Sequence, residues 1–227
     1  MIEAVLASRN AKKIEELRRI LEKTLPGIKL LSLSDIGYDD EIEETGGTFE
    51  ENAIIKASVP ASLGYIGIAD DSGLSVDVLC GAPGVTSARF AGEGCTPADC
   101  RVKLLEEMKD VPDENRGAGF VSVMALCLPD GSAITVPEKY AISEKLAALT
   151  NRKRERTVTV RGECRGVITT REIGTGGFGY DSLFLSDDLG VTFGEATAEA
   201  KDGVSHRGRS LEAFSRVLGE IFGGNKC

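Results

Sequence analysis

The stretch Ala69-Asp70-Asp71-Ser72-Gly73 places two adjacent carboxylates directly after the apolar run Tyr65 to Ala69. The apolar run predicts a buried strand, and the Ser and Gly that follow indicate that this strand ends in a turn. Neighbouring strand residues point to opposite faces, so one carboxylate can face a site while the other supports it from behind. Two interpretations stay open from this stretch alone: a solvated turn, and a metal site built on the two acids.

The composition limits the classes of protein that the chain can belong to. With 227 residues, 41% of them hydrophobic, and no Trp, we expect one large domain or two closely packed lobes with a substantial core. The formal net charge of -9 argues against a protein that coats a nucleic-acid duplex, because neutralising phosphates takes a basic surface. A small anionic ligand held by a few local cations remains possible.

The cysteines and the N-terminus predict a cytoplasmic protein. The six cysteines form no Cys-x-x-Cys pair, which is typical of reduced thiols and not of a zinc site or a disulfide framework. The apolar start of the chain is too short and too early interrupted by charge for a signal peptide, and no apolar run reaches membrane-spanning length.

The first segments predict a strand, a loop and an amphipathic helix. Ile2 to Ala7 is apolar, Ser8-Arg9-Asn10 follows, and apolar residues then recur at helical spacing. Backbone N–H groups of such a loop and helix start can face an anion, with added charge from Lys12 or Lys13. The alternative is a solvent-exposed helix face, which the charge pattern favours for Lys12 and leaves open for Lys13.

The next segments place acids and a lysine near the Asp pair. One residue of the acidic connection Asp35 to Glu44 can join the two aspartates in holding a hard cation. Thr48-Phe49-Glu50-Glu51 has the pattern of a capping box that opens a helix, and this helix contains Asn52 and Lys56. Pro60 is expected to kink or stop the helix.

The rest of the chain predicts further helices and strands. In chain order we expect a helix opened by Thr96-Pro97, a strand from Phe120 to Leu128, a hairpin turn at 129–131, a return strand from Ala133 to Val136, a short helix from Ile142 to Thr150, and strands over 157–160 and 165–169. The basic cluster Arg152 to Arg156 lacks interleaved aromatic residues, so a solvated loop is favoured over a nucleic-acid contact.

Gly174 to Gly179 matches the dinucleotide-binding pattern G-x-G-x-x-G, but the context argues against that function. The pattern should open a helix, whereas Tyr180 to Leu185 continues as strand-like sequence. The glycines instead allow the backbone to approach a planar ligand, with Phe178 available for stacking. Near the C-terminus, Ser205 is expected to cap a helix, and His206 and Arg207 offer neighbouring hydrogen-bond donors.

Taken together, these segments resemble the inosine/xanthosine triphosphate pyrophosphatase family over nearly the whole chain. The resemblance rests on motifs in a fixed order: Ala7 to Lys13, Glu44 to Ala53, Ala69 to Leu74, Gly81 to Gly84, Ser87 to Arg89, Gly177 to Asp181, and Ser205 to Gly208. It implies an α/β fold with an elongated mixed sheet and flanking helices, in which two lobes surround a central nucleotide-binding cleft. Residues 1–227 would form one catalytic domain of two packed lobes, with 138–156 as a surface connection longer than the family usually has.

The resemblance also implies an activity. Members of the family are Mg²⁺-dependent, usually homodimeric hydrolases that convert ITP, dITP and XTP to the monophosphate and pyrophosphate. The expected partner is therefore a small purine nucleoside triphosphate, with neither nucleic acid nor membrane. Asp71 would be the catalytic base. The remaining roles fall into three sets: Glu44, Asp70 and Asp71 for the metal; Ser8, Arg9, Asn10, Ala11, Lys12, Lys13 and Lys56 for the phosphates; and Ser72, Phe178, Gly179, Tyr180, Asp181, Lys201, His206 and Arg207 for the rest of the substrate.

Base selection follows from the pairing of donors and acceptors. Hypoxanthine and xanthine present an oxygen at position 6, which donors from His206, Arg207 or a backbone N–H can pair with, whereas adenine presents an amine there. Besides the longer 138–156 connection, two departures from the family pattern are visible: Ser8 stands in place of Thr, and Ser182 in place of a proline, which is expected to loosen the turn behind Asp181.

Two other functions compete with this prediction. A non-hydrolytic nucleotide- or RNA-binding module would use the same cleft, with Arg152 to Arg156 as its basic patch. A dinucleotide-dependent oxidoreductase would rest on the glycine run alone.

Overall fold

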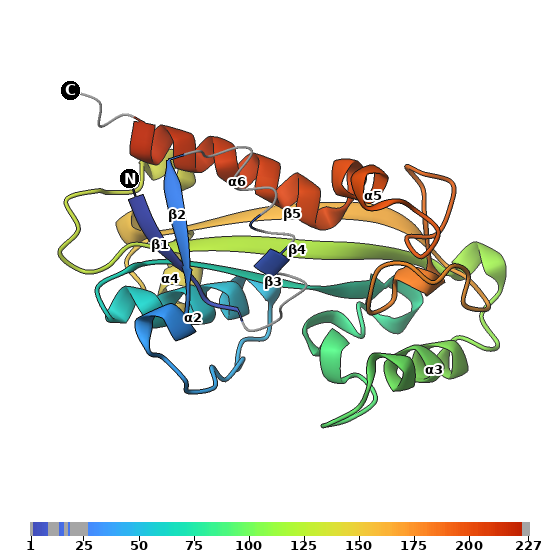
Figure 1. The fold of residues 1–227 in the computed structure, drawn as a ribbon. Coiled ribbons are helices and arrows are strands. Elements are labelled where there is room, and N and C mark those ends of the chain that lie inside the picture. The colour runs from blue at the N-terminus through green and yellow to red at the C-terminus, as the bar shows by residue number, and fades with distance from the viewer. Residues whose placement is uncertain (1, 9–13, 16–17, 19–26, 224–227) are drawn as a thin grey trace. The chain divides into compact units, whose positions relative to one another are not determined.

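The structure is a computed structural model that describes residues 2–8, 14, 15, 18 and 27–223. Of the helix expected after Asn10, the three described residues Ile14, Glu15 and Arg18 are helical. The described residues form a six-stranded sheet in the order β2-β1-β3-β4-β5-β6 (Figure 1). The strands are β1 (Ile2–Leu6), β2 (Ile28–Ser32), β3 (Ile66–Val76), β4 (Gly117–Cys127), β5 (Thr157–Ile168) and β6 (Phe184–Ser186).

The sheet is mixed, which confirms the predicted fold class of a mixed sheet with flanking helices. β1 pairs in parallel with both β2 and β3, and β5 pairs antiparallel with β6. The helices are α2 (Phe49–Ser62), α3 (Pro97–Glu107), α4 (Glu144–Thr150), α5 (Ala198–Val204) and α6 (His206–Gly223). Short 3-10 helices are η1 (Ser34–Ile36), η2 (Asp77–Leu79), η3 (Gly84–Arg89), η4 (Asp113–Asn115), η5 (Glu138–Tyr140), η6 (Arg154–Arg156) and η7 (Asp181–Leu183).

The chain forms two compact units. Unit 1 comprises residues 1–71, 123–161 and 210–227, and unit 2 comprises residues 72–122 and 162–209. In unit 1, α6 covers one face of the strands while α2 and α4 cover the other (Figure 1). Its core contains Leu6, Ile68, Met124, Leu211 and Phe214, all buried.

Unit 2 has its own core of aromatic and aliphatic side chains. Phe120 contacts both Phe184 and Phe193, with ring centroids 4.8 and 6.0 Å apart. Leu104 and Met108 attach α3 to this core. Thr96 caps α3, and Pro97 occupies its first turn, as predicted.

The strand expected to end at the two aspartates does not end there, and the solvated-turn interpretation is wrong, because β3 continues without a break from Ile66 to Val76. Asp70 and Asp71 therefore lie in the middle of a strand and are only 1% and 5% exposed. Leu74 and Val76 are fully buried in the core of unit 2. Burial of these apolar residues, together with the strand's backbone hydrogen bonds, outweighs the turn preference of Ser72 and Gly73.

The predicted return strand from Ala133 to Val136 is also wrong. Its place beside β4 is taken by the twelve-residue β5. Leu128 N donates to Arg156 O at one end of the pair (2.8 Å), and Ile168 N donates to Arg116 O at the other (2.9 Å), so β4 and β5 run antiparallel. The two strands predicted over 157–160 and 165–169 are parts of this single β5.

Two smaller expectations also need correction. The strand predicted from Tyr180 to Leu185 begins with the 3-10 turn η7, and only Phe184–Ser186 is strand. Pro60 was expected to kink or stop α2, and the second alternative is wrong, because the helix continues to Ser62. Proline removes only its own N–H donor, and the chain closes the last turn through Leu63 N and Gly64 N.

Residues 138–156 belong to unit 1 and pack against its other elements. Ser143 caps α4, Ile142 is buried, and the Tyr140 hydroxyl donates to Glu220 on α6 (2.6 Å). The arginines of the basic cluster donate to backbone carbonyls: Arg152 to Leu128, Arg154 to Ile142, and Arg156 to both Ser132 and Ile134. Their guanidinium groups thus hold neighbouring loops in place.

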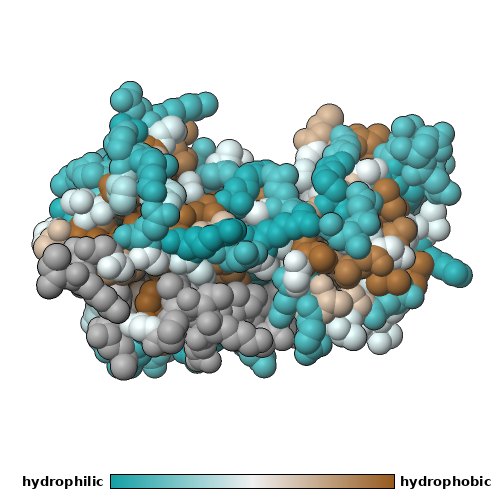
Figure 2. Space-filling model, turned by 90° about the horizontal axis from the view of Figure 1, so that it is seen from above, coloured by the Kyte–Doolittle hydropathy of each residue, from teal (hydrophilic) through white to brown (hydrophobic). Residues whose placement is uncertain are grey.

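The face of the molecule shown in Figure 2 is mostly hydrophilic, with hydrophobic residues in small patches between polar ones. Within the part of the chain that the structure describes, none of the helices combines the length and the apolar character needed to span a bilayer.

Candidate active site

A buried lysine bridges two carboxylates in unit 1. Lys56 Nζ lies 2.8 Å from Asp71 Oδ1 and 2.8 Å from Glu44 Oε1. Lys56 comes from α2, Asp71 from the middle of β3, and Glu44 from the loop that precedes α2. Three consecutive segments, the loop before α2, α2 itself and β3, therefore bring one ammonium group and two carboxylates together.

The start of α2 holds the same cluster from its other side. Asn52 is fully buried; its Nδ2 donates to Asp71 Oδ2 (3.4 Å), and its Oδ1 accepts from Gly46 N (2.8 Å). A Cβ at Gly46 would lie 2.6 Å from Asn52 Oδ1, so this close approach requires glycine. The glycine thus brings the loop containing Glu44 onto the helix.

The predicted capping box at this helix start is half formed. Thr48 Oγ1 accepts from Glu51 N (3.2 Å), as a capping box requires. Glu51 Oε2 instead accepts from Gly47 N (2.9 Å), one residue before the cap. The Glu51 carboxylate thus binds the N–H of Gly47 and not that of the cap residue, and this hydrogen bond holds the loop against the helix.

Electrostatics keep Lys56 charged. Burial alone would lower the pKa of Lys56, but the carboxylates of Asp71, Asp70 and Glu44 outweigh burial and raise the pKa above its ordinary value. In the described residues, no cluster of three or more His, Cys, Asp or Glu side chains has the arrangement of a metal site. The grouping that the structure does contain is two carboxylates around one ammonium.

Unit 2 contains a second buried ion pair. Lys201 Nζ on α5 lies 2.7 Å from Asp181 Oδ2, which also accepts from Phe178 N (2.7 Å). Lys201 and Asp181 are 8% and 3% exposed. A Cβ at Gly177 would lie 2.1 Å from Asp181 Oδ2, so the loop folds tightly over this carboxylate.

The ring of Phe178 lies near two cations. Lys201 Nζ is 5.1 Å and Arg207 Cζ 5.3 Å from the ring centroid. Arg207 Nη2 also donates to the hydroxyl of Ser72 (3.2 Å), the residue after Asp71. His206 differs: its ring is 3% exposed and stacks on Phe120 at 4.8 Å. The predicted residues Phe178, Asp181, Lys201 and Arg207 therefore form one group, to which Ser72 is joined.

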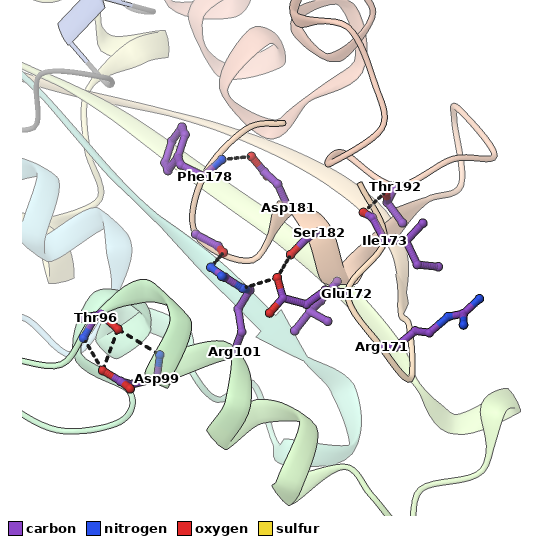
Figure 3. Close-up of polar contacts among 12 residues, drawn as sticks. Thr96, Asp99, Arg101, Arg171, Glu172, Ile173, Phe178, Asp181, Ser182 and Thr192 are labelled. Carbon is purple, nitrogen blue, oxygen red and sulfur yellow. Dashed lines mark hydrogen bonds and ion pairs between the residues drawn. The ribbon is translucent and has the colours of Figure 1, made fainter. Parts of the chain in front are cut away.

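Polar contacts hold the loop from Phe178 to Ser182 against α3 (Figure 3). Arg101 on α3 donates to Gly179 O (2.9 Å) and to Glu172 Oε2 (2.8 Å), and Ser182 Oγ donates to the same carboxylate oxygen (2.8 Å). Ser182, expected to loosen this turn, thus anchors it through its hydroxyl. Tyr180 points elsewhere: its hydroxyl donates to Ser87 O (2.9 Å), and burial raises the pKa of this phenol.

Comparison with known proteins identifies the family. The family model described as the Ham1 family matches residues 4–217. The chain belongs to the Ham1 family. It is 45% identical to the dITP/XTP pyrophosphatase of Nocardia farcinica, with 97% of each chain covered, and 44% identical to that of Geobacter sulfurreducens, with 96% of this chain and 98% of the relative covered.

Solved structures of Ham1 proteins have the same fold. A HAM1 protein from Coxiella burnetii superposes with a TM-score of 0.80 at 36% identity, covering 97% of this chain and all of that one. The Ham1 protein of Staphylococcus aureus gives a TM-score of 0.77 at 33% identity, covering 95% and 97%.

The structure describes most, but not all, of the residues predicted for a Ham1-type site. Arg9, Asn10, Ala11, Lys12 and Lys13 lie outside the described residues, and Ser8 is the last described residue before them. Sequence reasoning assigned no role to Asn52, Arg101 or Glu172. Only Asn52 has a signal in the sequence, because it precedes Lys56 by four residues and so shares its helix face.

Proposed function

We propose that this Ham1-family protein hydrolyses the non-standard purine nucleoside triphosphates ITP, dITP and XTP to the monophosphate and pyrophosphate. The names of its relatives supply the substrate class. The observation that carries the proposal is the buried cluster of Lys56, Asp71 and Glu44, which combines a cation for phosphate with carboxylates for a base and a metal. The runner-up functions, RNA binding and dinucleotide-dependent oxidoreduction, gain no comparable observation.

The carboxylates of this cluster fit a magnesium ion. Mg²⁺ is held by one or two carboxylates plus waters and substrate phosphates, so Asp71 and Glu44 suffice, with Asp70 beside them in the strand. The raised pKa of Lys56 supports this fit, because the same carboxylates favour a positive charge beside them. When bound, Mg²⁺ would polarise the phosphate oxygens and make a water molecule more acidic.

The chain's own residues divide the remaining work. Asp71 accepts the proton of the attacking water at Oδ2, which receives the longer hydrogen bond, from Asn52, while Oδ1 stays paired with Lys56. Lys56 places its charge where negative charge develops on the pyrophosphate. Asn52 fixes the direction of the Asp71 carboxylate. Ser8 and residues 9–13 would bind the phosphates, as the family resemblance implies.

The group in unit 2 would bind the base. Phe178 offers a ring for stacking, and Lys201 and Arg207 offer donors suited to the oxygen at position 6 of hypoxanthine or xanthine. The same donors face the amine of adenine without a partner, which costs about 1–3 kcal/mol for a buried polar group. His206 supports this group through its stacking on Phe120.

A substrate panel with product identification tests the proposal. The protein is incubated with Mg²⁺ and ITP, XTP, GTP or ATP, and the products are separated by chromatography. We expect monophosphate and pyrophosphate from ITP and XTP, with much slower turnover of ATP. Release of orthophosphate, or equal turnover of ATP, would contradict the proposal.

Asp71→Asn tests the role of the base. We expect the turnover of ITP to fall by about 10²–10⁴-fold, because a positioned general base contributes that much. The exposed Asp113→Asn is the matched control and should keep normal turnover. Normal activity in a folded Asp71→Asn variant would remove Asp71 from this role.

The homodimer and the cytoplasmic location stay predictions of the family resemblance. Analytical ultracentrifugation of the full chain measures the first, and a single monomeric species would contradict it.

A further inference from the structure

Two cysteines contact each other at the start of α3. The sulfur atoms of Cys95 and Cys100 are 3.2 Å apart. Both sulfurs also lie near the carbonyl oxygen of Ala88, at 3.8 and 3.9 Å. The distance of 3.2 Å between the two sulfurs is shorter than the separation of about 3.5–4.0 Å at which nonbonded carbon atoms pack.

The helix start explains why the two sulfurs meet. Thr96 is the N-cap of α3, so Cys95 is the residue before the cap and Cys100 the fourth helical residue. Side chains at these two positions pack against each other in the arrangement known as a hydrophobic staple. The capping box fixes the arrangement: Asp99 Oδ2 accepts from Thr96 N (2.8 Å) and Thr96 Oγ1 accepts from Asp99 N (3.2 Å), as Figure 3 shows.

The two thiols differ in access to solvent. Cys95 is partly exposed, whereas Cys100 is 2% exposed. Of the other described cysteines, Cys80 is exposed, and Cys127 and Cys164 are fully buried. Cys127 contacts the Ser58 hydroxyl, and Cys164 contacts the His206 ring, not a second sulfur. An external oxidant can thus reach Cys95, and Cys100 lies directly behind it.

The contact between the thiols also shifts their pKa values in opposite directions. Burial would raise the pKa of Cys100, but the backbone N–H of Ala91 and the thiol of Cys95 outweigh burial and lower the pKa. The same bond to Cys100 raises the pKa of Cys95. Cys100 therefore supplies the resolving thiolate, whereas its exposure to solvent makes Cys95 the thiol that an external disulfide meets first.

We propose that Cys95 and Cys100 form a thiol–disulfide site, which closes to an intramolecular disulfide by exchange with a small-molecule disulfide such as oxidised glutathione. The sulfurs need to approach by about 1 Å to reach the bond length of about 2.0 Å. We expect rotation about the Cα–Cβ bonds of the two cysteines to supply this approach.

The exchange occurs in two balanced steps. The Cys95 thiolate attacks one sulfur of the small disulfide, forms a mixed disulfide, and releases the other half as a thiol after protonation. The Cys100 thiolate then attacks the Cys95 sulfur and releases the second half as a thiol. Two protein thiols are oxidised, one small disulfide is reduced to two thiols, and the protons of the protein thiols end on those products.

Mass spectrometry of the folded, full-length protein tests the site. A background variant carries Cys80→Ser and Cys227→Ser, which removes one exposed thiol and the C-terminal one. It is incubated with oxidised glutathione, quenched in acid and digested without reduction. We expect the intact mass to fall by two hydrogens and a peptide that joins Cys95 to Cys100. A stable glutathione adduct at Cys95, or unmodified thiols at both positions, would overturn the proposal.

Single substitutions in this background separate the two roles. With Cys100→Ser, we expect the glutathione adduct to accumulate on Cys95, because the resolving thiol is absent. With Cys95→Ser, we expect no modification, because Cys100 is buried. If Cys100 in the Cys95→Ser variant were modified as fully as Cys95 in the Cys100→Ser variant, the two thiols would react independently. That result would contradict the order of steps. Circular dichroism checks that each variant is folded.

Discussion

At the scale of single residues, the pairing of Lys56 with Asp71 is the contact on which the proposed chemistry rests. The two side chains are only 10% and 7% exposed, so neither charge is well hydrated. Removing one partner of such a pair leaves the other buried without compensation, which costs far more than the pair contributes. The charged form of the buried Asp71 carboxylate is therefore stabilised by the Lys56 ammonium beside it.

Lys56→Met tests this dependence. We expect the free energy of unfolding to fall by about 3–5 kcal/mol at pH 7, because the charge of Asp71 stays buried while its main cation is lost. Urea denaturation followed by circular dichroism measures the change. Lys153→Met, in an exposed pair with Asp130, is the matched control and should change stability by less than about 1 kcal/mol.

The same variant gives a pH dependence with a defined sign. The pKa of Lys56 is higher in the folded than in the unfolded state, so its stabilising contribution is complete below the unfolded-state pKa of about 10.4. The contribution is lost as the pH rises through the folded-state pKa. We expect the difference in stability between wild type and Lys56→Met to be constant from pH 8 to 10 and to shrink above that. A difference that grows with pH above 10 would contradict the raised pKa.

At the scale of elements, close packing of α2 on β3 sets the position of Lys56 and Asn52. A Cβ at Gly67 of β3 would lie 1.9 Å from the carbonyl oxygen of Ala57 on α2. A contact this short with backbone cannot be relieved by side-chain rotation, so the helix or the strand has to move.

Gly67→Ala should therefore lower both stability and activity. We expect the free energy of unfolding to fall by about 3 kcal/mol, at the upper end of overpacking effects, measured by urea denaturation. Gly219→Ala in α6 is the control, because nothing lies within 4 Å of its Cβ position. That change should raise stability by up to about 1 kcal/mol, since alanine favours the helix. Equal effects of the two changes would show that α2 is not held at Gly67.

α3 positions the loop that is proposed to bind the base, through Arg101. Arg101→Ala removes the hydrogen bonds to Gly179 and Glu172, so we expect the KM for ITP to rise about tenfold, with kcat within about threefold of wild type. Arg209→Ala is the control, because Arg209 likewise pairs with one carboxylate, of Asp188, and one carbonyl, of Glu163. A fall in kcat alone, or the same change in both variants, would contradict a positioning role.

Sequence patterns predicted the elements whose signals are local. The cap of α3 at Thr96 and the cap of α6 at Ser205 follow from side chains that bond within one turn. The course of β3 through Asp70 and Asp71 was missed, because Leu74 and Val76 are buried in a core whose other members, such as Leu104 and Phe184, are distant in sequence, and this burial overrides the local turn preference. The Arg101–Glu172 pair joins residues 71 positions apart, and no spacing pattern reveals it.

At the scale of the whole molecule, the two units are joined by continuous elements. The boundaries fall after Asp71 in β3, after Ser122 in β4, after Arg161 in β5 and after Arg209 in α6. Three strands and one helix thus begin in one unit and end in the other. A strand interrupted at such a boundary would lose hydrogen bonds and buried side chains on both sides, so partial unfolding of one unit is costly for the other.

Gly67→Ala tests this coupling, because Gly67 lies in unit 1 while α3 lies wholly in unit 2. Hydrogen exchange measured by mass spectrometry reports the opening free energy of the slowest amides of α2 and α3 separately. If the units unfold together, the change lowers both values by the same amount, about 3 kcal/mol. Retained protection of α3 alongside lost protection of α2 would instead show that unit 2 unfolds independently. Gly219→Ala should raise both values together, which gives the coupling a second measurement of opposite sign.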